Sequence, residues 1–89
     1  MSKSLLAQRK PFYLKPWMEL IGNLNKISRD EHYLYLEIAD KVLAFRKESD
    51  EALYIQEKLN IGYIGREIAL LRTDMPEKPI LIHVGKGVL

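Results

Sequence analysis

The residue types that most often carry out catalysis or bind metals are few in this sequence and widely spaced. His32 and His83 are the only histidines, and neither has a second histidine or a cysteine at metal-ligand spacing. The chain has no cysteine, which excludes disulfides, zinc–thiolate sites and thiol nucleophiles. We therefore expect no metal site and no cofactor, and a structural or surface role for both histidines.

The acidic and hydroxyl side chains show no catalytic arrangement either. Asp30-Glu31 and Asp50-Glu51 are adjacent pairs, whereas two carboxylates that act together as acid and base converge across a cleft. We interpret the first pair as part of a turn and the second as the start of a helix, where acids suit the helix dipole. No motif places a base beside the hydroxyl residues Ser28, Ser49 and Thr73.

One glycine-containing stretch has part of the spacing of a phosphate-binding loop. Gly62 and Gly65 are followed by Arg66, but the Walker pattern is missing. Phosphate loops also open a helix, whereas this stretch precedes an expected strand. We interpret it as a helix stop followed by a turn, and Lys86 between two glycines as part of a flexible tail. The sequence therefore predicts a protein that is not an enzyme.

Length and composition indicate one small globular domain. The chain has 89 residues, of which 47% are hydrophobic and 29% charged, with a net charge of +2. Residues 1–16 contain four basic residues and no acid, so the remaining chain is slightly acidic. No apolar run is long enough to span a bilayer, and the N-terminus does not resemble a signal peptide. We expect a soluble cytoplasmic protein without a membrane partner.

The first half of the chain has the alternation of β-strands. Residues 17–28 predict one long strand in which Met18, Leu20 and Leu24 share a face, and Gly22 in that row marks a bulge or bend. Residues 32–39 and 42–46 predict a hairpin with Asp40-Lys41 as its two-residue turn. One face of the hairpin would hold Leu34, Leu36, Ile38, Leu43 and Phe45, and the other Tyr33, Tyr35, Glu37, Ala44 and Arg46.

The second half predicts one helix and two more strands. Ser49 is a suitable cap for a helix over residues 50–60, and Ala52, Ile55 and Leu59 have helical spacing. Residues 64–73 then predict a strand that is apolar on both faces near its centre. Residues 79–84 predict a last strand that begins at a proline.

This order of elements resembles the OB-fold, a five-stranded Greek-key β-barrel. The resemblance covers residues 17–84 and depends on the order of elements, on Gly22 in the long first strand and on the capped helix. It implies a mainly β fold with one helix. The residues themselves predict a basic and partly flexible arm over residues 1–16 before this domain and a flexible tail over residues 85–89 after it. An SH3-like barrel and an open α+β sheet with one helix on its face are the alternatives.

The resemblance also implies where a ligand would bind, because OB barrels bind oligonucleotides on the face of their second and third strands. Aromatic rings stack on bases and nearby cations attract phosphates. The predicted nucleic-acid-binding residues, for single-stranded DNA or RNA, are Tyr33, Tyr35, Arg46, Arg29, Lys26 and Trp17. In a competing interpretation, the tyrosines are β-formers that cover exposed sheet, and Trp17 plugs one end of the barrel. Glu37 on the same face would repel phosphate.

A second functional hypothesis is a module for protein interaction or self-assembly. The strands carry more apolar residues than one small barrel can bury, and exposed apolar patches often mark interfaces. The predicted interface residues are Ile21, Leu71 and Leu81, with Ala69 beside them. The mild net charge and the slightly acidic body fit this class better than nucleic-acid binding.

Overall fold

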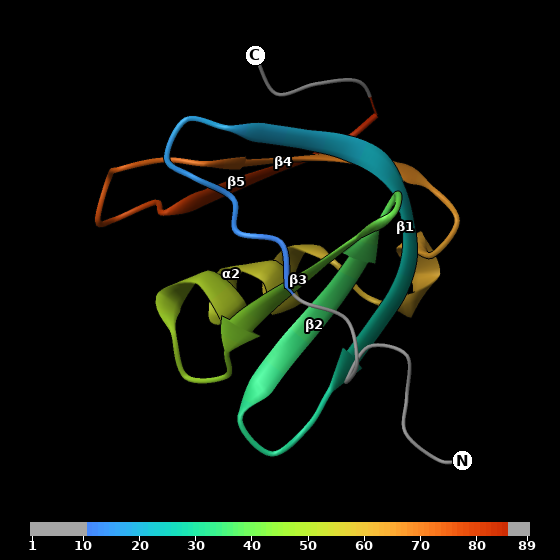
Figure 1. Ribbon diagram of the computed structural model, residues 1–89, viewed down its shortest axis with the longest axis horizontal. Coiled ribbons are helices and arrows are strands. Elements are labelled where there is room, and N and C mark those ends of the chain that lie inside the picture. The colour runs from blue at the N-terminus through green and yellow to red at the C-terminus, as the bar shows by residue number, and fades with distance from the viewer. Residues whose placement is uncertain (1–10, 86–89) are drawn as a thin grey trace.

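The computed structural model describes residues 11–85, in which five antiparallel strands form one sheet in the order β3-β2-β1-β4-β5 (Figure 1). Because β4 returns to lie beside β1, the first four strands have the spatial order of a Greek key. The mainly β prediction with one helix is confirmed, but no pairing joins β3 to β5 within this range, so the sheet is not closed. The elements are β1 Glu19–Arg29, β2 Tyr33–Ile38, β3 Lys41–Arg46, α2 Asp50–Lys58, the 3-10 turn η1 Ile61–Tyr63, β4 Glu67–Arg72 and β5 Ile80–Val84.

Strand β1 is long because it belongs to both halves of the sheet. Residues 19–23 pair with β4, and the stretch from Leu24 onward pairs with β2. The register shifts between Leu24 and Lys26, where one extra residue forms a bulge. The predicted bend is therefore present, and Figure 1 shows the curved strand, but the irregularity lies beyond Gly22. Gly22 instead permits a close approach, because a Cβ there would lie 2.7 Å from the Cβ of Ala39.

The β2–β3 hairpin turns one residue earlier than predicted. Ile38 pairs with Lys41, so the turn residues are Ala39 and Asp40 and the predicted turn at Asp40-Lys41 is wrong. Contacts with β1 hold the turn here. The Ala39 N–H donates to the carbonyl of Asn23 at 3.0 Å, and the Ala39 carbonyl accepts from Asn25 Nδ2 at 2.8 Å. Ala39 has a φ of 55°, in the left-handed region that favours glycine.

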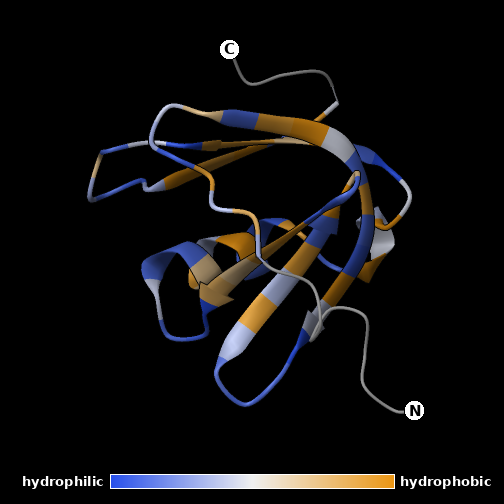
Figure 2. Ribbon diagram, in the orientation of Figure 1, coloured by the Kyte–Doolittle hydropathy of each residue, from blue (hydrophilic) through white to orange (hydrophobic). Residues whose placement is uncertain are grey.

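The shifted turn nevertheless keeps the predicted faces of the hairpin. An earlier two-residue turn moves every partner by two positions, and side chains alternate with a period of two. The residues predicted to face the core are all buried, at 3% exposure or less, and Figure 2 shows the alternation of apolar and polar residues along β2. These residues are Leu34, Leu36, Ile38, Leu43 and Phe45.

The helix forms as its cap and apolar stripe predict. The hydroxyl of Ser49 accepts a hydrogen bond from the Ala52 N–H at 3.1 Å, and Ala52, Ile55 and Leu59 are buried. After η1, strand β4 begins at Glu67, whereas the sequence predicted a strand from residue 64. Helix α2 contacts both β3 and β5, the two edge strands. It therefore covers part of the opening that the unpaired edges leave.

Residues 11–16 cross the same opening (Figure 1). The Phe12 N–H donates to the carbonyl of Val42 on the free edge of β3 at 2.6 Å, and Leu14 is buried in the core. The Trp17 N–H donates to the carbonyl of Arg72 at the end of β4. Part of the segment predicted as an arm therefore packs into the fold. The rest of that arm, residues 1–10, and most of the predicted tail, residues 86–89, lie outside the described residues.

Arg72 joins the pieces that meet at this opening. Its Nε donates to the carbonyl of Leu14, and its Nη1 pairs with Glu51 Oε2 on α2. The guanidinium also lies 5.5 Å from the ring centroid of Tyr13 and 5.9 Å from that of Phe45 on β3. The Arg72 and Glu51 side chains are only 16% and 24% exposed. Four separate segments are thus connected through one mostly buried side chain, which we call the Arg72 clamp.

Candidate nucleic-acid interface

One face of strands β1, β2 and β3 points away from the core and carries aromatic and basic side chains. Tyr33 pairs with Arg46, and Tyr35 lies between Ala44 on β3 and Ser28 on β1. Directly paired residues of antiparallel strands point to the same side. We call this surface the tyrosine face; it consists of Lys26, Ser28, Tyr33, Tyr35, Glu37, Ala44 and Arg46, together with Val42, which pairs with Glu37 and is buried at 2% exposure.

Two tyrosine rings lie next to each other on this face. The ring centroids of Tyr33 and Tyr35 are 6.2 Å apart and the ring planes are tilted by 38°. Both side chains are half-buried, and Arg46 beside Tyr33 is exposed. The arrangement offers aromatic surface next to a cation, which is what stacking on bases and attraction of phosphate require.

A hydrogen-bond network around Asp30 holds the second of these rings in place. The Tyr35 hydroxyl donates to Asp30 Oδ2 at 2.7 Å, while the N–H groups of His32 and Tyr33 donate to Oδ1, each at 2.8 Å. These bonds, led by the one from Tyr35, lower the pKa of Asp30 below its usual value. The same bond raises the pKa of the Tyr35 hydroxyl, because it stabilises the protonated phenol. Asp30 thus forms the β1–β2 turn and fixes one ring of the candidate site.

This network makes the titration of Tyr35 a test of the site geometry. We expect the Tyr35 hydroxyl to ionise above pH 10, and Asp30→Asn to lower its pKa toward the ordinary value. Since the raised pKa favours the neutral phenol in the folded state, the bond stabilises the fold below pH 10. That stabilisation is lost as the pH rises through the raised pKa.

At the acid end, the depressed pKa of Asp30 stabilises the fold above about pH 3.8, and this stabilisation is lost as the pH falls through the depressed pKa.

The measurement is the 13Cζ chemical shift of Tyr35, assigned by comparison with Tyr35→Phe. A Tyr35 titration that Asp30→Asn leaves unchanged would contradict the network.

The structure brings together four of the six predicted binding residues: Tyr33, Tyr35, Arg46 and Lys26. Arg29 pairs with Leu34 and therefore lies on the core side of the sheet, at its rim. Trp17 is 52% exposed but precedes β1, at the opposite end of that strand from the tyrosines. Lys26 pairs with Glu37, so an acid lies beside one of the two cations on the face.

Asp30 was not predicted as part of the site, although an aspartate before a strand is a typical turn former whose side chain binds backbone N–H groups.

The predicted interface residues differ in exposure. Ile21 is 43% exposed on the outer side of β1, while Leu81 is half-buried. Leu71 and Ala69 are buried, at 1% and 0% exposure, so β4 is buried on both of its faces. Only Ile21 of this group therefore offers a substantial apolar surface; Trp17 and Met18, just before β1, are also exposed.

The residue range that the structure describes has no cluster of three or more His, Asp or Glu side chains placed to bind a metal ion. It likewise contains no helix with the length and apolar character needed to cross a membrane. Comparison of the chain with protein-family models, with curated proteins and with solved structures found no significant match. Support for the candidate interface therefore comes from the geometry of the tyrosine face alone.

Proposed function

We propose that this protein is a small non-enzymatic module that binds single-stranded nucleic acid on the tyrosine face. The observation that carries the proposal is the adjacent pair of tyrosine rings, 6.2 Å apart, with the exposed Arg46 directly across from Tyr33. Rings of this kind stack on bases of any sequence, and the cation attracts the backbone. Tyr35, fixed by Asp30, would bind a base without first having to be ordered.

The fold supports the same proposal. The OB-fold is a partly open Greek-key barrel that binds oligonucleotides on its second and third strands. The tyrosine face lies on β2 and β3, and the strand order with one helix between β3 and β4 is compatible with that architecture. We propose an OB-type barrel whose opening between β3 and β5 is filled by α2 and by residues 11–16.

The charges on the face set the expected strength of binding. Lys26 and Arg46 are its two cations, and Glu37 reduces the attraction of Lys26 for phosphate. With two phosphate contacts, the logarithm of the binding constant should fall with the logarithm of salt concentration with a slope of about −1.4. We therefore propose weak, sequence-tolerant binding in which stacking contributes more than ion pairing.

The test is a titration of fluorescently labelled poly-dT and poly-U with the full chain at low salt. Tyr35→Ala should weaken binding about tenfold, because one base–aromatic stack is worth roughly 1–3 kcal/mol. Tyr35→Phe keeps the ring and should retain most of the affinity, and Arg46→Gln should make the salt slope shallower. Tyr54→Ala, on α2 and away from the face, is the matched control. Binding no tighter than millimolar, or unaffected by Tyr35→Ala, would reject the proposal.

A module for self-association is the second candidate, and the exposed Ile21, Trp17 and Met18 favour it. These apolar side chains lie near the beginning of β1, on a part of the surface that the tyrosine face does not include. Sedimentation velocity separates the two candidates. Concentration-dependent association that Ile21→Glu abolishes supports the second, and a monomer at high concentration rejects self-association.

A further inference from the structure

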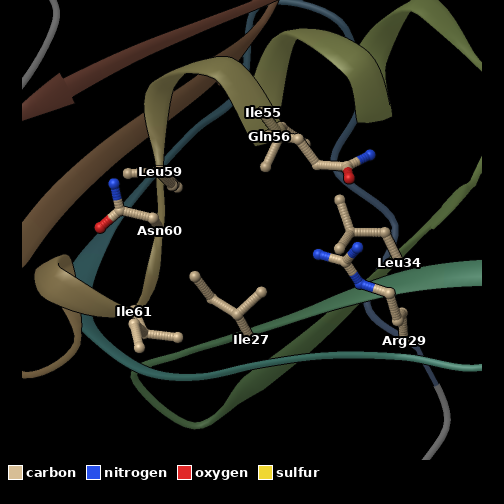
Figure 3. Close-up of a pocket in the computed structure, with 8 residues that line it drawn as sticks. All are labelled: Ile27, Arg29, Leu34, Ile55, Gln56, Leu59, Asn60 and Ile61. Carbon is tan, nitrogen blue, oxygen red and sulfur yellow. The ribbon is translucent and has the colours of Figure 1, made fainter.

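A cavity of about 240 Å³ opens on the core side of the sheet, at the rim where β1 and β2 meet α2 and η1 (Figure 3). Leu34, Ile55 and Leu59 form its inner wall, and each is at most 4% exposed. Ile27 and the 80% exposed Ile61 complete the apolar lining toward solvent. The cavity is on the opposite side of the sheet from the tyrosine face, so it is a separate site.

Arg29 supplies the only charge in this lining. It ends β1 in register with Leu34, and Figure 3 shows its guanidinium lying alongside Leu34 at the cavity. None of the ion pairs within residues 11–85 includes Arg29. The neighbouring Asp30 carboxylate is bound by Tyr35 and by backbone N–H groups instead. The guanidinium is therefore available to an anion.

The side chains of the two remaining polar residues of the lining have one internal hydrogen bond each. Gln56 Nε2 donates to the carbonyl of Ala52 at 3.2 Å, and Asn60 Oδ1 accepts from the Gly62 N–H at 2.8 Å. Neither amide carries charge, so the site has apolar walls, one cation and no carboxylate in its lining. Small-molecule sites have this composition, with mostly apolar walls and a few polar groups that orient the ligand.

We infer that this cavity binds small amphipathic organic anions, with the apolar body between the sheet and α2 and the carboxylate on Arg29. Size supports this class, because a cavity of about 150 Å³ lined by aliphatic side chains holds a benzene ring. The larger volume here has room for such a ring and a short acidic arm. Arg binds carboxylates through two parallel N–H donors, which selects a carboxylate over a neutral polar group.

The experiment is a titration of the 15N-labelled full chain with phenylacetate, followed by chemical-shift changes. Phenylacetamide, which has nearly the same shape without the charge, is the matched probe, and acetate tests the headgroup alone. We expect saturable phenylacetate binding with a millimolar or lower Kd, with the largest shifts at Ile27, Leu59 and Ile61 and none at Ala44 and Arg46 on the tyrosine face. Phenylacetamide should bind about tenfold more weakly and acetate should show no saturation.

Two variants at exposed positions test the assignment without cost to the core. Arg29→Gln should weaken phenylacetate binding about tenfold and leave phenylacetamide within twofold, and Ile61→Asp should weaken phenylacetate at least as much by placing an acid at the rim. Arg46→Gln, a cation on the other side of the sheet, is the control and should change nothing. The inference is overturned if phenylacetate does not saturate, if its shifts fall on the tyrosine face, or if Arg29→Gln affects both probes equally. Equal binding of phenylacetate and phenylacetamide would also overturn the inference, because it would indicate a site for an uncharged apolar group.

Discussion

Replacing Arg72 with alanine should lower the free energy of unfolding by about 3 kcal/mol, since breaking a mostly buried ion pair leaves the partner charge without compensation. The variant leaves the Glu51 carboxylate unpaired at 24% exposure and removes the donor that binds the Leu14 carbonyl. It also removes the cation stacked near the rings of Tyr13 and Phe45. All four segments that meet at the sheet opening lose a contact together. Equilibrium unfolding in denaturant measures the loss.

Arg66→Ala is the matched control for this prediction. Arg66 is exposed and stacks near Tyr63 at 5.5 Å, so its loss should cost about 0.5 kcal/mol or less. The double variant with Arg72→Met and Glu51→Met should be much closer to the natural protein than Arg72→Ala, because both charges are removed together. If Arg72→Ala unfolds at the same denaturant concentration as Arg66→Ala, the clamp does not hold the fold together.

The Gly22→Ala variant should lose about 1–3 kcal/mol of stability through overpacking. The new Cβ would lie 2.7 Å from the Cβ of Ala39 and 3.3 Å from its backbone nitrogen, distances that require the β2–β3 turn to move. That turn is bound to β1 directly after Gly22, through the Asn23 carbonyl and the Asn25 amide. The turn therefore cannot move away without losing hydrogen bonds.

A second substitution tests this explanation directly. Ala39→Gly removes the atom that Gly22→Ala would meet, and it relieves the left-handed backbone at Ala39, whose φ is 55°. The double variant should therefore recover most of the stability that Gly22→Ala alone loses. Thermal and denaturant unfolding of the two single variants and the double variant measure the coupling. Additive effects would show that Gly22 is needed for another reason.

The local features of the fold could be predicted from the sequence because each depends on residues that are close together in the chain. Ser49 and the stripe of Ala52, Ile55 and Leu59 determine where α2 begins and which side of it is buried. In the hairpin, alternation predicted the faces even though the turn was wrong. A shift by two positions preserves the side of every residue, and only a shift by one would have exchanged them.

The parts that could not be predicted depend on distant contacts or on a single inserted residue. The bulge between Leu24 and Lys26 reverses the side to which later residues of β1 point, which brings Lys26 to the tyrosine face and puts Arg29 at the cavity. The local sequence pattern gives only one sign of this bulge. The apolar Ile27 does not fall on the same alternating series of positions as Leu24. The packing of residues 11–16 into the opening depends on Arg72, which is 58 positions away from Leu14.

The distance in sequence between Leu14 and Arg72 has a consequence for the order of assembly during translation. Leu14 leaves the ribosome long before the residues that bury and bind it, and domains emerge N-terminal end first. Until β4 has been made, Tyr13 and Leu14 lack the Arg72 side chain that both of them contact. Their docking is accordingly a late step of biogenesis, and a nascent chain stalled before Arg72 would leave this segment open to chaperones.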